Sequence, residues 1–369
     1  MTCERRRVLF LVPSLISGGA ERVFSTLLRH LDRERFEIHL AVLEAKGAYM
    51  RDVPEDVIVH DLKVSRIRYA MLSLIRITRK VRPDAVLSTL VYLNLQLLLV
   101  RPFLPAGTRV FVRESTMASI FLAQDTRHPT ILPWIYRHLY PKADRIVCLS
   151  DAMIHDLAEH FSLPREKLVR IYNPLDLEMI RRMADIDGNP YSSPGPHLVA
   201  AGRLSREKGF DLLLNSMPSV LEALPRARLS ILGEGPLEAE LKGRARELGV
   251  AEAVEFPGLQ QNPWRYFKYA DVFILPSRYE GLPNALLEAL ALGTQAVVAD
   301  SPGAMREIED AGEQMVLVDP ESPDALAKAI LYQCGRSNAL GHPRQRTDTF
   351  LKKFGLQDVV KAYSELLLA

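Results

Sequence analysis

Two carboxylates lie in a segment that is predicted to run from a strand through a loop into a helix. The apolar run Val272–Leu275 is typical of a buried strand, and Glu280 and Glu288 follow it with seven residues between them. Proline is favoured in the first turn of a helix, so Pro283 predicts a helix start between the two carboxylates. The free N–H groups of a helix start favour an anion. The segment could therefore hold a negatively charged ligand close to Glu280.

The two glutamates differ in how easily a structural role explains them. Glu280 could simply complement the positive end of the helix dipole. Glu288 is surrounded by the leucines and alanines of residues 285–292, and burying a carboxylate there without a hydrogen-bond partner would be costly. A polyhydroxylated ligand would supply that partner.

Two cations follow the predicted strand His197–Ala201. Arg203 comes directly after it, and Lys208 stands just before the next predicted helix. This pair suits a diphosphate, because an arginine can fork onto two oxygens while a lysine acts as a point charge. The alternative is a solvated surface loop in which both cations lie in water with Arg206 and Glu207.

Pairs of glycines follow two further predicted strands. Gly18 and Gly19 lie between the first strand and the first helix, and Gly233-Glu234-Gly235 follows a later strand. Glycine lets the backbone approach a phosphate, a sugar or a base closely. A simple tight turn explains either pair equally well.

Strands alternate with amphipathic helices in both halves of the chain, which is typical of βαβ units with parallel sheets. In such sheets ligands bind beyond the carboxyl ends of the strands, and all four segments lie at such ends. The predicted strands are Arg7–Pro13, Glu37–Leu43, Ala85–Ser88, Arg109–Val112, Arg145–Leu149, His197–Ala201, Arg228–Leu232, Val254–Phe256, Val272–Leu275, Gln295–Ala299 and Gln314–Val318.

A concentration of turn-forming residues after Asn173 predicts a domain boundary. We expect an N-terminal domain at residues 1–173, a linker at 174–196, a C-terminal domain at 197–355 and a closing helix at 356–369. Two doubly wound domains facing one another would form a cleft for the ligand.

The composition is that of an ordinary soluble globular protein. The chain has 369 residues, of which 48% are hydrophobic and 25% charged, which excludes disordered, collagen-like and disulfide-scaffold classes. Its three cysteines are too few and too scattered for a zinc site, and they suit a reducing compartment. The longest apolar stretch, Val86–Val100, contains four polar residues and predicts a buried strand and helix rather than a membrane span. We see no secretory signal.

Positive charge is concentrated in the first half of the chain. Residues 1–175 hold 26 Lys/Arg and 18 Asp/Glu, whereas residues 176–369 hold 21 and 27. The run Lys63–Arg82 has seven cations, no acid and apolar residues at helical spacing, which is typical of a basic amphipathic helix on an anionic membrane. An ordinary packing helix with a cationic outer face is the alternative. Nucleic acid is not indicated, because interleaved aromatic residues are lacking. The candidate membrane-facing residues are Arg66, Arg68, Arg76, Arg79 and Lys80.

Together these motifs resemble the GT4 family of retaining glycosyltransferases. The family has the α/β fold called GT-B, in which two Rossmann-like doubly wound domains face each other across a cleft. The similarity covers almost the whole chain and is strongest from His197 to Asp319. The matching pieces are Gly18-Gly19, Gly202-Arg203, Lys208-Gly209, Gly233-Glu234-Gly235, and Glu280 with Glu288.

The resemblance implies a role for each motif. Arg203 and Lys208 would hold the diphosphate of a nucleotide-sugar donor, and Glu280 would contact hydroxyl groups of the donor sugar; these three are the catalytic candidates. Glu288 would contact the ribose. The other donor-binding candidates are Gly18 and Gly19, which would close over the donor from the first domain, and Gly233, Glu234, Gly281, Leu282, Pro283 and Asn284.

The chain departs from the family pattern at one place. Many members carry a histidine near the reacting sugar, after the fourth or fifth strand of the first domain, where this chain has Arg113 and Glu114. Branches that resemble this chain and act on lipid-linked oligosaccharides often carry such an Arg/Glu pair, which makes both residues acceptor-side candidates. A local ion pair at the end of a strand is the alternative.

The implied activity is retaining, metal-independent transfer of a hexose or N-acetylhexosamine from a nucleotide sugar, expected to be UDP-linked, to a glycan or lipid-linked glycan. No metal or other cofactor is expected, and the Asp-x-Asp at Asp185 and Asp187 falls in the predicted linker. The enzyme would be cytoplasmic and peripheral on the inner face of the cytoplasmic membrane, with an anionic membrane surface as partner and no nucleic acid. The alternatives are a GT-B epimerase or phosphorylase-like enzyme and a non-catalytic nucleotide-sugar-binding scaffold.

Overall fold

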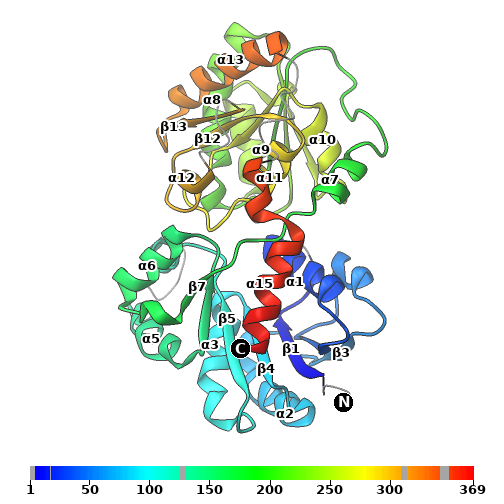
Figure 1. Cartoon of the computed structure of the whole chain (residues 1–369). Helices are drawn as coiled ribbons and strands as arrows, with labels where there is room; N and C mark the ends of the chain where they lie inside the picture. The colour runs from blue at the N-terminus through cyan, green and yellow to red at the C-terminus, as the bar shows by residue number, and fades with distance from the viewer. Residues whose placement is uncertain (1–4, 17, 125–129, 309–313, 341–348) are drawn as a thin grey trace. The chain divides into compact units, whose positions relative to one another are not determined.

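The computed structural model describes residues 5–16, 18–124, 130–308, 314–340 and 349–369. The chain divides into two compact units (Figure 1). Unit 1 comprises Met1–Pro174 together with Gln357–Ala369, and unit 2 comprises Leu175–Leu356. Of the three cysteines, Cys148 and Cys334 are buried free thiols, and Cys3 lies outside the described residues.

Unit 1 is built on a parallel sheet of seven strands in the order β3-β2-β1-β4-β5-β6-β7. Its central strands are apolar because helices cover both faces, and Val8–Val12 of β1 is at most 1% exposed. The strands are β1 Arg6–Val12, β2 Phe36–Val42, β3 Ile58–Asp61, β4 Ala85–Thr89, β5 Arg109–Arg113, β6 Arg145–Cys148 and β7 Leu168–Arg170. Sequence patterns predict all of them except β3, a mostly exposed edge strand, and β7, which has three residues.

The helices of unit 1 include the last one in the chain. Helix α15 belongs to this unit from Gln357 onward, where the Tyr363 side chain is fully buried and Arg6 Nη1 of β1 donates to the Leu367 carbonyl at 3.4 Å. Figure 1 draws α15 in red beside β1. The α-helices are α1 Gly19–His30, α2 Met71–Val81, α3 Val91–Val100, α4 Ala118–Gln124, α5 Ile131–Leu139, α6 Asp151–Phe161 and α15 Leu356–Leu368, and the 3₁₀ turns are Ala48–Asp52, Ile67–Tyr69, Arg101–Phe103, Tyr140–Lys142 and Arg165–Lys167.

Unit 2 is built on a parallel sheet of six strands in the order β10-β9-β8-β11-β12-β13. Leu198, Ile231 and Ile274, from three of these strands, are all fully buried in its core. The strands are β8 His197–Ala201, β9 Arg228–Leu232, β10 Val254–Gly258, β11 Val272–Leu275, β12 Gln295–Ala299 and β13 Met315–Val318.

The predicted linker is largely part of unit 2. Residues from Leu175 onward belong to this unit, and within them α7 packs against α10 and α11. Asp176 caps α7, since its Oδ1 accepts from the Met179 N–H at 2.9 Å. The α-helices of unit 2 are α7 Leu177–Ala184, α8 Phe210–Ala223, α9 Glu238–Glu247, α10 Trp264–Tyr269, α11 Asn284–Ala291, α12 Met305–Ile308 and α13 Pro323–Leu340, and the 3₁₀ turns are Arg206–Lys208, Ala251–Ala253 and Lys352–Phe354.

Each sheet has one point at which the strand order reverses. In unit 1 it lies between β1 and β4, and in unit 2 between β8 and β11. Ligands of open parallel sheets bind at the carboxyl edge beside this reversal point. In the part of the chain that the structure describes, no helix is long and apolar enough to cross a membrane.

Candidate active site

Two loops flank the reversal point of unit 2. One follows β8 and reaches Gly209, and the other follows β11 and reaches the start of α11. Their backbones are in close contact: a Cβ at Gly209 would lie 2.0 Å from the Pro276 carbonyl oxygen, and Gly209 has a φ of +64°. Glycine is required at this position both by the φ angle and by the contact.

Lys208 and Glu280 meet across these loops. Lys208 Nζ donates to Glu280 Oε1 at 2.6 Å, and the Ser277 hydroxyl donates to the same oxygen at 2.8 Å. The side chain of Glu280 is 9% exposed and that of Lys208 is 22% exposed. Because both bonds fall on Oε1, the second carboxylate oxygen of Glu280 is the one that can serve a ligand. The sequence predicts both residues at this edge but not their ion pair.

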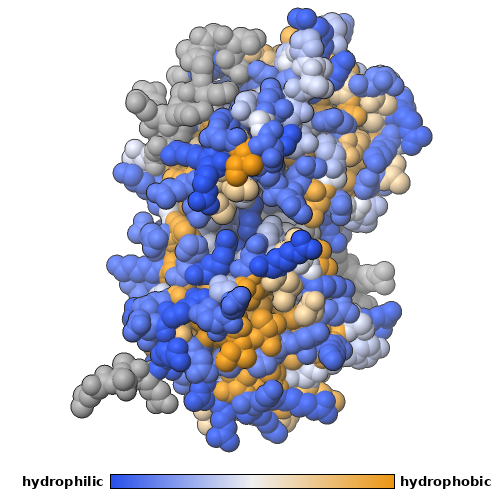
Figure 2. All heavy atoms as spheres, turned by 90° about the vertical axis from the view of Figure 1, so that its right-hand side faces the viewer, coloured by the Kyte–Doolittle hydropathy of each residue, from blue (hydrophilic) through white to orange (hydrophobic). Residues whose placement is uncertain are grey.

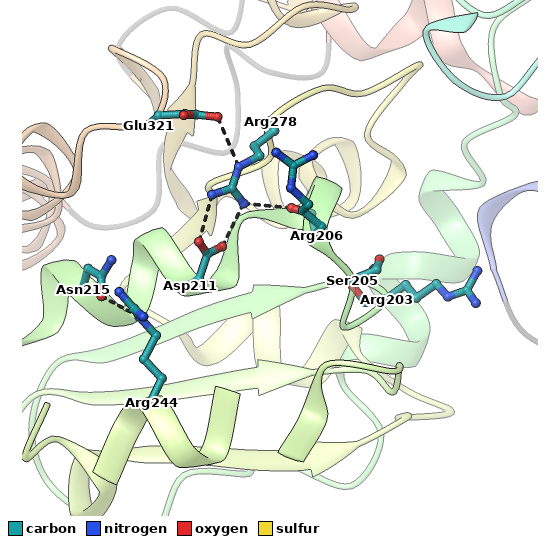
Figure 3. Close-up of polar contacts among 8 residues, drawn as sticks. All are labelled: Arg203, Ser205, Arg206, Asp211, Asn215, Arg244, Arg278 and Glu321. Carbon is teal, nitrogen blue, oxygen red and sulfur yellow. Dashed lines mark hydrogen bonds and ion pairs between the residues drawn. The ribbon is translucent and has the colours of Figure 1, made fainter. Parts of the chain in front are cut away.

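Arg203 lies in the same loop as Lys208 and is exposed. Figure 3 shows its side chain extending away from the cluster of Arg206, Asp211 and Arg278. An exposed guanidinium on the loop that carries Lys208 can bind an anion without first breaking an internal contact.

Glu288 has an internal hydrogen-bond partner that the sequence did not predict. Its Oε2 accepts from the Trp264 indole Nε1–H at 2.9 Å, and the two residues are 3% and 7% exposed. Trp264 begins α10, so a donor from a neighbouring helix stabilises the carboxylate on the apolar face of α11. An internal donor rather than a ligand therefore supplies a hydrogen-bond partner for Glu288, and its role toward ribose stays a prediction.

The remaining donor-site candidates line the same edge of unit 2. Gly233 has a φ of +130°, and a Cβ there would lie 2.0 Å from the Gly202 carbonyl oxygen. The Glu234 carbonyl accepts from the Leu204 N–H at 3.0 Å, while the Glu234 side chain is exposed. These contacts bring the loop after β9 to the loop after β8. Gly281, Leu282 and Pro283 are buried at the start of α11, and Asn284 is half-buried.

Two candidates of unit 1 lie at its own reversal point. Gly18 precedes α1 with a φ of +130°, and Gly19 is the first residue of that helix. Both are exposed at the carboxyl end of β1. Their backbone is therefore accessible to a ligand at this edge.

The two acceptor-side candidates, Arg113 and Glu114, are fully buried in unit 1. Glu114 accepts hydrogen bonds from the Tyr140 hydroxyl, from Asn94 Nδ2 at 3.1 Å and from the Tyr136 hydroxyl at 3.3 Å. Burial raises the pKa of the Glu114 carboxyl, and these three donors oppose that shift. These internal donors give the Glu114 carboxylate a structural role in unit 1, and its role toward an acceptor stays a prediction.

Arg113 points into a different network. Its guanidinium donates to Thr89 Oγ1 at 3.1 Å and to Asn173 Oδ1 at 2.5 Å. It thereby joins the ends of β4 and β5 to the segment that leads out of unit 1. Arg113 and Glu114 therefore bond to different partners, although the charge of Arg113 helps to oppose the rise that burial causes in the pKa of Glu114.

The basic run of unit 1 is shorter as a helix than expected. Lys63 has a φ of +53°, a 3₁₀ turn covers Ile67–Tyr69, and α2 covers only Met71–Val81. The five candidate cations are all exposed. The apolar face of α2, including Leu74 and Ile77, is buried in unit 1 and so cannot enter a membrane.

Comparison with known proteins places this geometry in a family. Residues 187–333 match the model for glycosyl transferases group 1, and residues 17–179 match the model for glycosyltransferase family 4. A Campylobacter jejuni relative, N-acetylgalactosamine-N,N'-diacetylbacillosaminyl-diphospho-undecaprenol 4-alpha-N-acetylgalactosaminyltransferase, is 30% identical over 328 residues, which span 86% of this chain and 87% of the relative. The chain belongs to glycosyltransferase family 4.

Other similar proteins agree with this assignment of the family. The Rhizobium meliloti lipopolysaccharide core biosynthesis glycosyltransferase LpsE is 25% identical over 95% of this chain and 96% of its own length. Among solved structures, Anabaena HepE in complex with UDP and glucose aligns with a TM-score of 0.78 at 16% identity, covering 98% of this chain and 99% of HepE. Sucrose-phosphate synthase from Thermosynechococcus elongatus aligns with a TM-score of 0.80 at 14% identity over 98% of each chain. These structural matches show the GT-B fold.

In this family 4 glycosyltransferase the structure adds three residues that sequence reasoning missed. Ser277, Arg278 and Trp264 each donate to a carboxylate or carbonyl at the candidate site. Ser277 and Arg278 lie between the strand and the helix that carry Glu280 and Glu288, so their position in the sequence could have indicated them. Trp264 lies 24 residues from Glu288 and has no such signal. Among the described residues no group of three or more His, Cys, Asp or Glu side chains could hold a metal ion.

Proposed function

We propose that this glycosyltransferase moves a hexose or N-acetylhexosamine from a UDP-linked sugar to a glycan or lipid-linked glycan, with retention and without a metal. The Lys208–Glu280 pair at the reversal point of unit 2 carries the proposal. The names of similar proteins support its substrate classes: the C. jejuni relative is named for transfer to a diphospho-undecaprenol-linked sugar, and the HepE structure holds UDP and glucose.

The site offers complementary groups to the two ends of the donor. Arg203 and Lys208 can neutralise the diphosphate, whose charge grows as the anomeric C–O bond breaks and its electron pair moves to the leaving oxygen. The N–H groups at the start of α11 favour the same anion. Glu280, held at Oε1 by Lys208 and Ser277, can accept from a sugar hydroxyl at its other oxygen. Two cations and a helix start perform the charge neutralisation that a metal performs in other transferases.

Retention follows if the acceptor attacks on the face that the diphosphate leaves. The acceptor oxygen then bonds to the anomeric carbon while its proton passes to the departing phosphate oxygen, which lies on that same face. The sugar is oxocarbenium-like at this point, as glycosyl transfer generally requires. In this mechanism none of the chain's own carboxylates has to act as a base, which is compatible with the burial of Glu114.

The membrane part of the proposal rests on unit 1. Arg66, Arg68, Arg76, Arg79 and Lys80 are exposed, and exposed apolar side chains lie close to them in sequence, including Tyr69 at 62% and Leu72 at 65%. Figure 2 shows apolar residues, in orange, gathered among hydrophilic ones in the lower half of that view. Cations beside apolar residues suit the headgroup region of an anionic cytoplasmic leaflet, where a lipid-linked acceptor would be found.

A transfer assay tests the activity. The purified chain is incubated with UDP-hexoses and UDP-N-acetylhexosamines, a panel of glycan and lipid-linked glycan acceptors, and an excess of EDTA. We expect release of UDP that depends on acceptor, and a product whose anomeric configuration, measured by proton NMR, equals that of the donor. An inverted product or complete loss of activity in EDTA contradicts the mechanism. Sugar phosphate formed without acceptor would instead favour a phosphorylase-like enzyme.

A further inference from the structure

A second arginine, outside the donor-contacting set, ties the two loops of the site together. Arg278 follows Ser277 in the loop after β11, and its side chain is 13% exposed. Figure 3 shows its guanidinium surrounded by Asp211, Arg206 and Glu321. These three residues come from α8, from the loop after β8 and from the segment after β13.

The hydrogen bonds of Arg278 use nearly the whole guanidinium. Nη1 and Nη2 donate to the two carboxylate oxygens of Asp211, each at 2.8 Å, and Nη1 also donates to the Arg206 carbonyl at 2.9 Å. Nε donates to Glu321 Oε1 at 3.2 Å. A forked contact of this kind fixes orientation as well as charge, and a lysine cannot reproduce it.

The backbone of Arg278 makes the same connection. Its N–H donates to the Glu207 carbonyl at 2.8 Å, so side chain and main chain both hold the residues directly before Lys208. Glu280 lies two residues after Arg278 in the same loop, and its N–H donates to the Pro302 carbonyl at 3.0 Å. Lys208 and Glu280 therefore project from two backbones that Arg278 joins.

We propose that Arg278 is a positioning residue: it locks the loop 203–208 to the loop 276–281, and thereby sets the placement of Lys208 against Glu280 for the donor diphosphate. The inference rests on the proposed function for its consequence in catalysis. The contacts by which Arg278 joins the two loops, called the lock below, are present in the protein without a bound ligand. Mutual electrostatic stabilisation supports it, because the hydrogen bonds and charge of Asp211 raise the pKa of Arg278.

The chain offers a matched control for this residue. Arg244 of α9 is also half-buried and also binds α8, since its Nε donates to Asn215 Oδ1 at 2.7 Å. Figure 3 shows both arginines against the same helix. Of these two arginines, Arg278 alone reaches the loop that carries Lys208. Arg244→Gln therefore removes an arginine contact with α8 without touching that loop.

The experiment combines hydrogen exchange of the empty protein with calorimetric titration of UDP. For Arg278→Gln we expect faster amide exchange across residues 205–209 and a dissociation constant for UDP raised about tenfold, within the usual range of coupling between neighbouring groups. Arg244→Gln should leave both unchanged. Arg278→Lys should resemble Arg278→Gln, because a lysine cannot donate to both carboxylate oxygens of Asp211 in the forked geometry. Asp211→Asn, which changes the other partner of this contact, should also speed the amide exchange and weaken UDP binding.

A double substitution separates positioning from a general loss of stability. If Arg278 acts through Lys208, Arg278→Gln should weaken UDP binding by less than about twofold in a Lys208→Gln background. The proposal is overturned if Arg278→Gln has the amide exchange and the UDP affinity of the wild type, or if Arg278→Gln and Arg244→Gln weaken UDP binding equally. It is also overturned if the losses in binding free energy from Arg278→Gln and Lys208→Gln simply add. If the wild type binds no UDP, the proposed function fails, and the exchange of residues 205–209 alone decides whether the lock exists.

Discussion

At the scale of single residues, Lys208 and Arg203 share a proposed ligand but differ in their surroundings. Arg203 is exposed, so Arg203→Ala should lower turnover about 100-fold with an unchanged melting temperature. Lys208→Ala should lower turnover at least as much, and it should also lower the melting temperature, because Glu280 loses its ion pair. Initial rates of UDP release and calorimetric melting measure both quantities. Near-normal rates in both variants would mean that the donor site is wrong.

Substitutions of Glu280 and of Glu288 should impair different steps, sugar transfer and UDP binding. Glu280→Gln is expected to impair transfer from the UDP-sugar while UDP itself binds within about twofold of the wild type, because this carboxylate meets the sugar. Glu288→Gln should weaken the binding of UDP, because this carboxylate contacts the ribose. The Trp264 contact survives in that variant, since a glutamine carbonyl also accepts from the indole. Titration with UDP alone distinguishes the two, and equal losses would contradict the division of roles.

The Asp211 carboxyl should lower the free energy of unfolding of unit 2 as the pH falls. Burial alone would raise the pKa of this carboxyl, but the hydrogen bonds and charge of Arg278 outweigh it and lower the pKa below the ordinary 3.8. The unfolded chain therefore takes up a proton first as the pH falls. The stabilisation is complete well above pH 3.8 and is lost as the pH drops through the lower folded value. Urea unfolding from pH 6 to pH 3 should show the stability gap between wild type and Asp211→Asn narrowing over that window; a gap independent of pH would contradict it.

The sequence was a good guide to some of these residues and not to others. Lys208 and Glu280 were found because each follows a strongly apolar strand, and the carboxyl ends of parallel strands meet at one edge. Trp264 and Asp211 were missed because their roles depend on contacts between distant segments, which no local pattern encodes. The partners of Glu114 were missed for the same reason: its two tyrosines lie 22 and 26 residues away.

At the scale of elements, α2 and the turn before it should bind anionic membranes through charge rather than insertion of the helix. Each exposed cation near a bilayer contributes about 1 kcal/mol, and the attraction is screened over about 8 Å at physiological salt. We therefore expect the protein to sediment with anionic vesicles at low salt, but little with neutral ones. Changing Arg66, Arg68, Arg76 and Arg79 to glutamate should abolish binding.

The control for this test carries the same change of charge on unit 2. Arg226, Lys242, Arg246 and Lys328 are exposed there, and their replacement by glutamate should leave vesicle binding nearly intact. If the wild type does not sediment with anionic vesicles at low salt, or if both quadruple variants lose vesicle binding equally, α2 and the turn before it do not bind the membrane.

Element boundaries were predictable where burial was strong. The strands β8, β9, β11 and β12 have the bounds that their apolar runs predict, because a parallel strand covered on both faces must be apolar along its length. The exposed edge strand β3 lacks that signal. Helix α7 was missed because it lies among turn-forming residues, and its place in unit 2 depends on packing against α10 and α11.

At the scale of the whole molecule, the fold class followed from the alternation of strands and helices, but the membership of the units did not. The chain returns to unit 1 after Leu356, a long-range connection that leaves no mark in local sequence. The charge of the chain also divides by region, with 26 Lys/Arg against 18 Asp/Glu in residues 1–175. An anionic surface should therefore attract the first part of the chain and repel the second, which carries 21 against 27.

Unit 2 is expected to bind a UDP-linked sugar at the loop that carries Arg203 and Lys208. Thermal unfolding across a panel of nucleotide sugars tests this binding most directly, because a ligand that binds only the folded state raises the melting temperature. At about 100 times the dissociation constant the gain is about 2.7 kcal/mol, which corresponds to several degrees for domains of this size. We predict such a rise with UDP-sugars and its loss in Arg203→Ala and Lys208→Ala. No rise with any UDP-sugar, or an equal rise in both variants, would contradict the account.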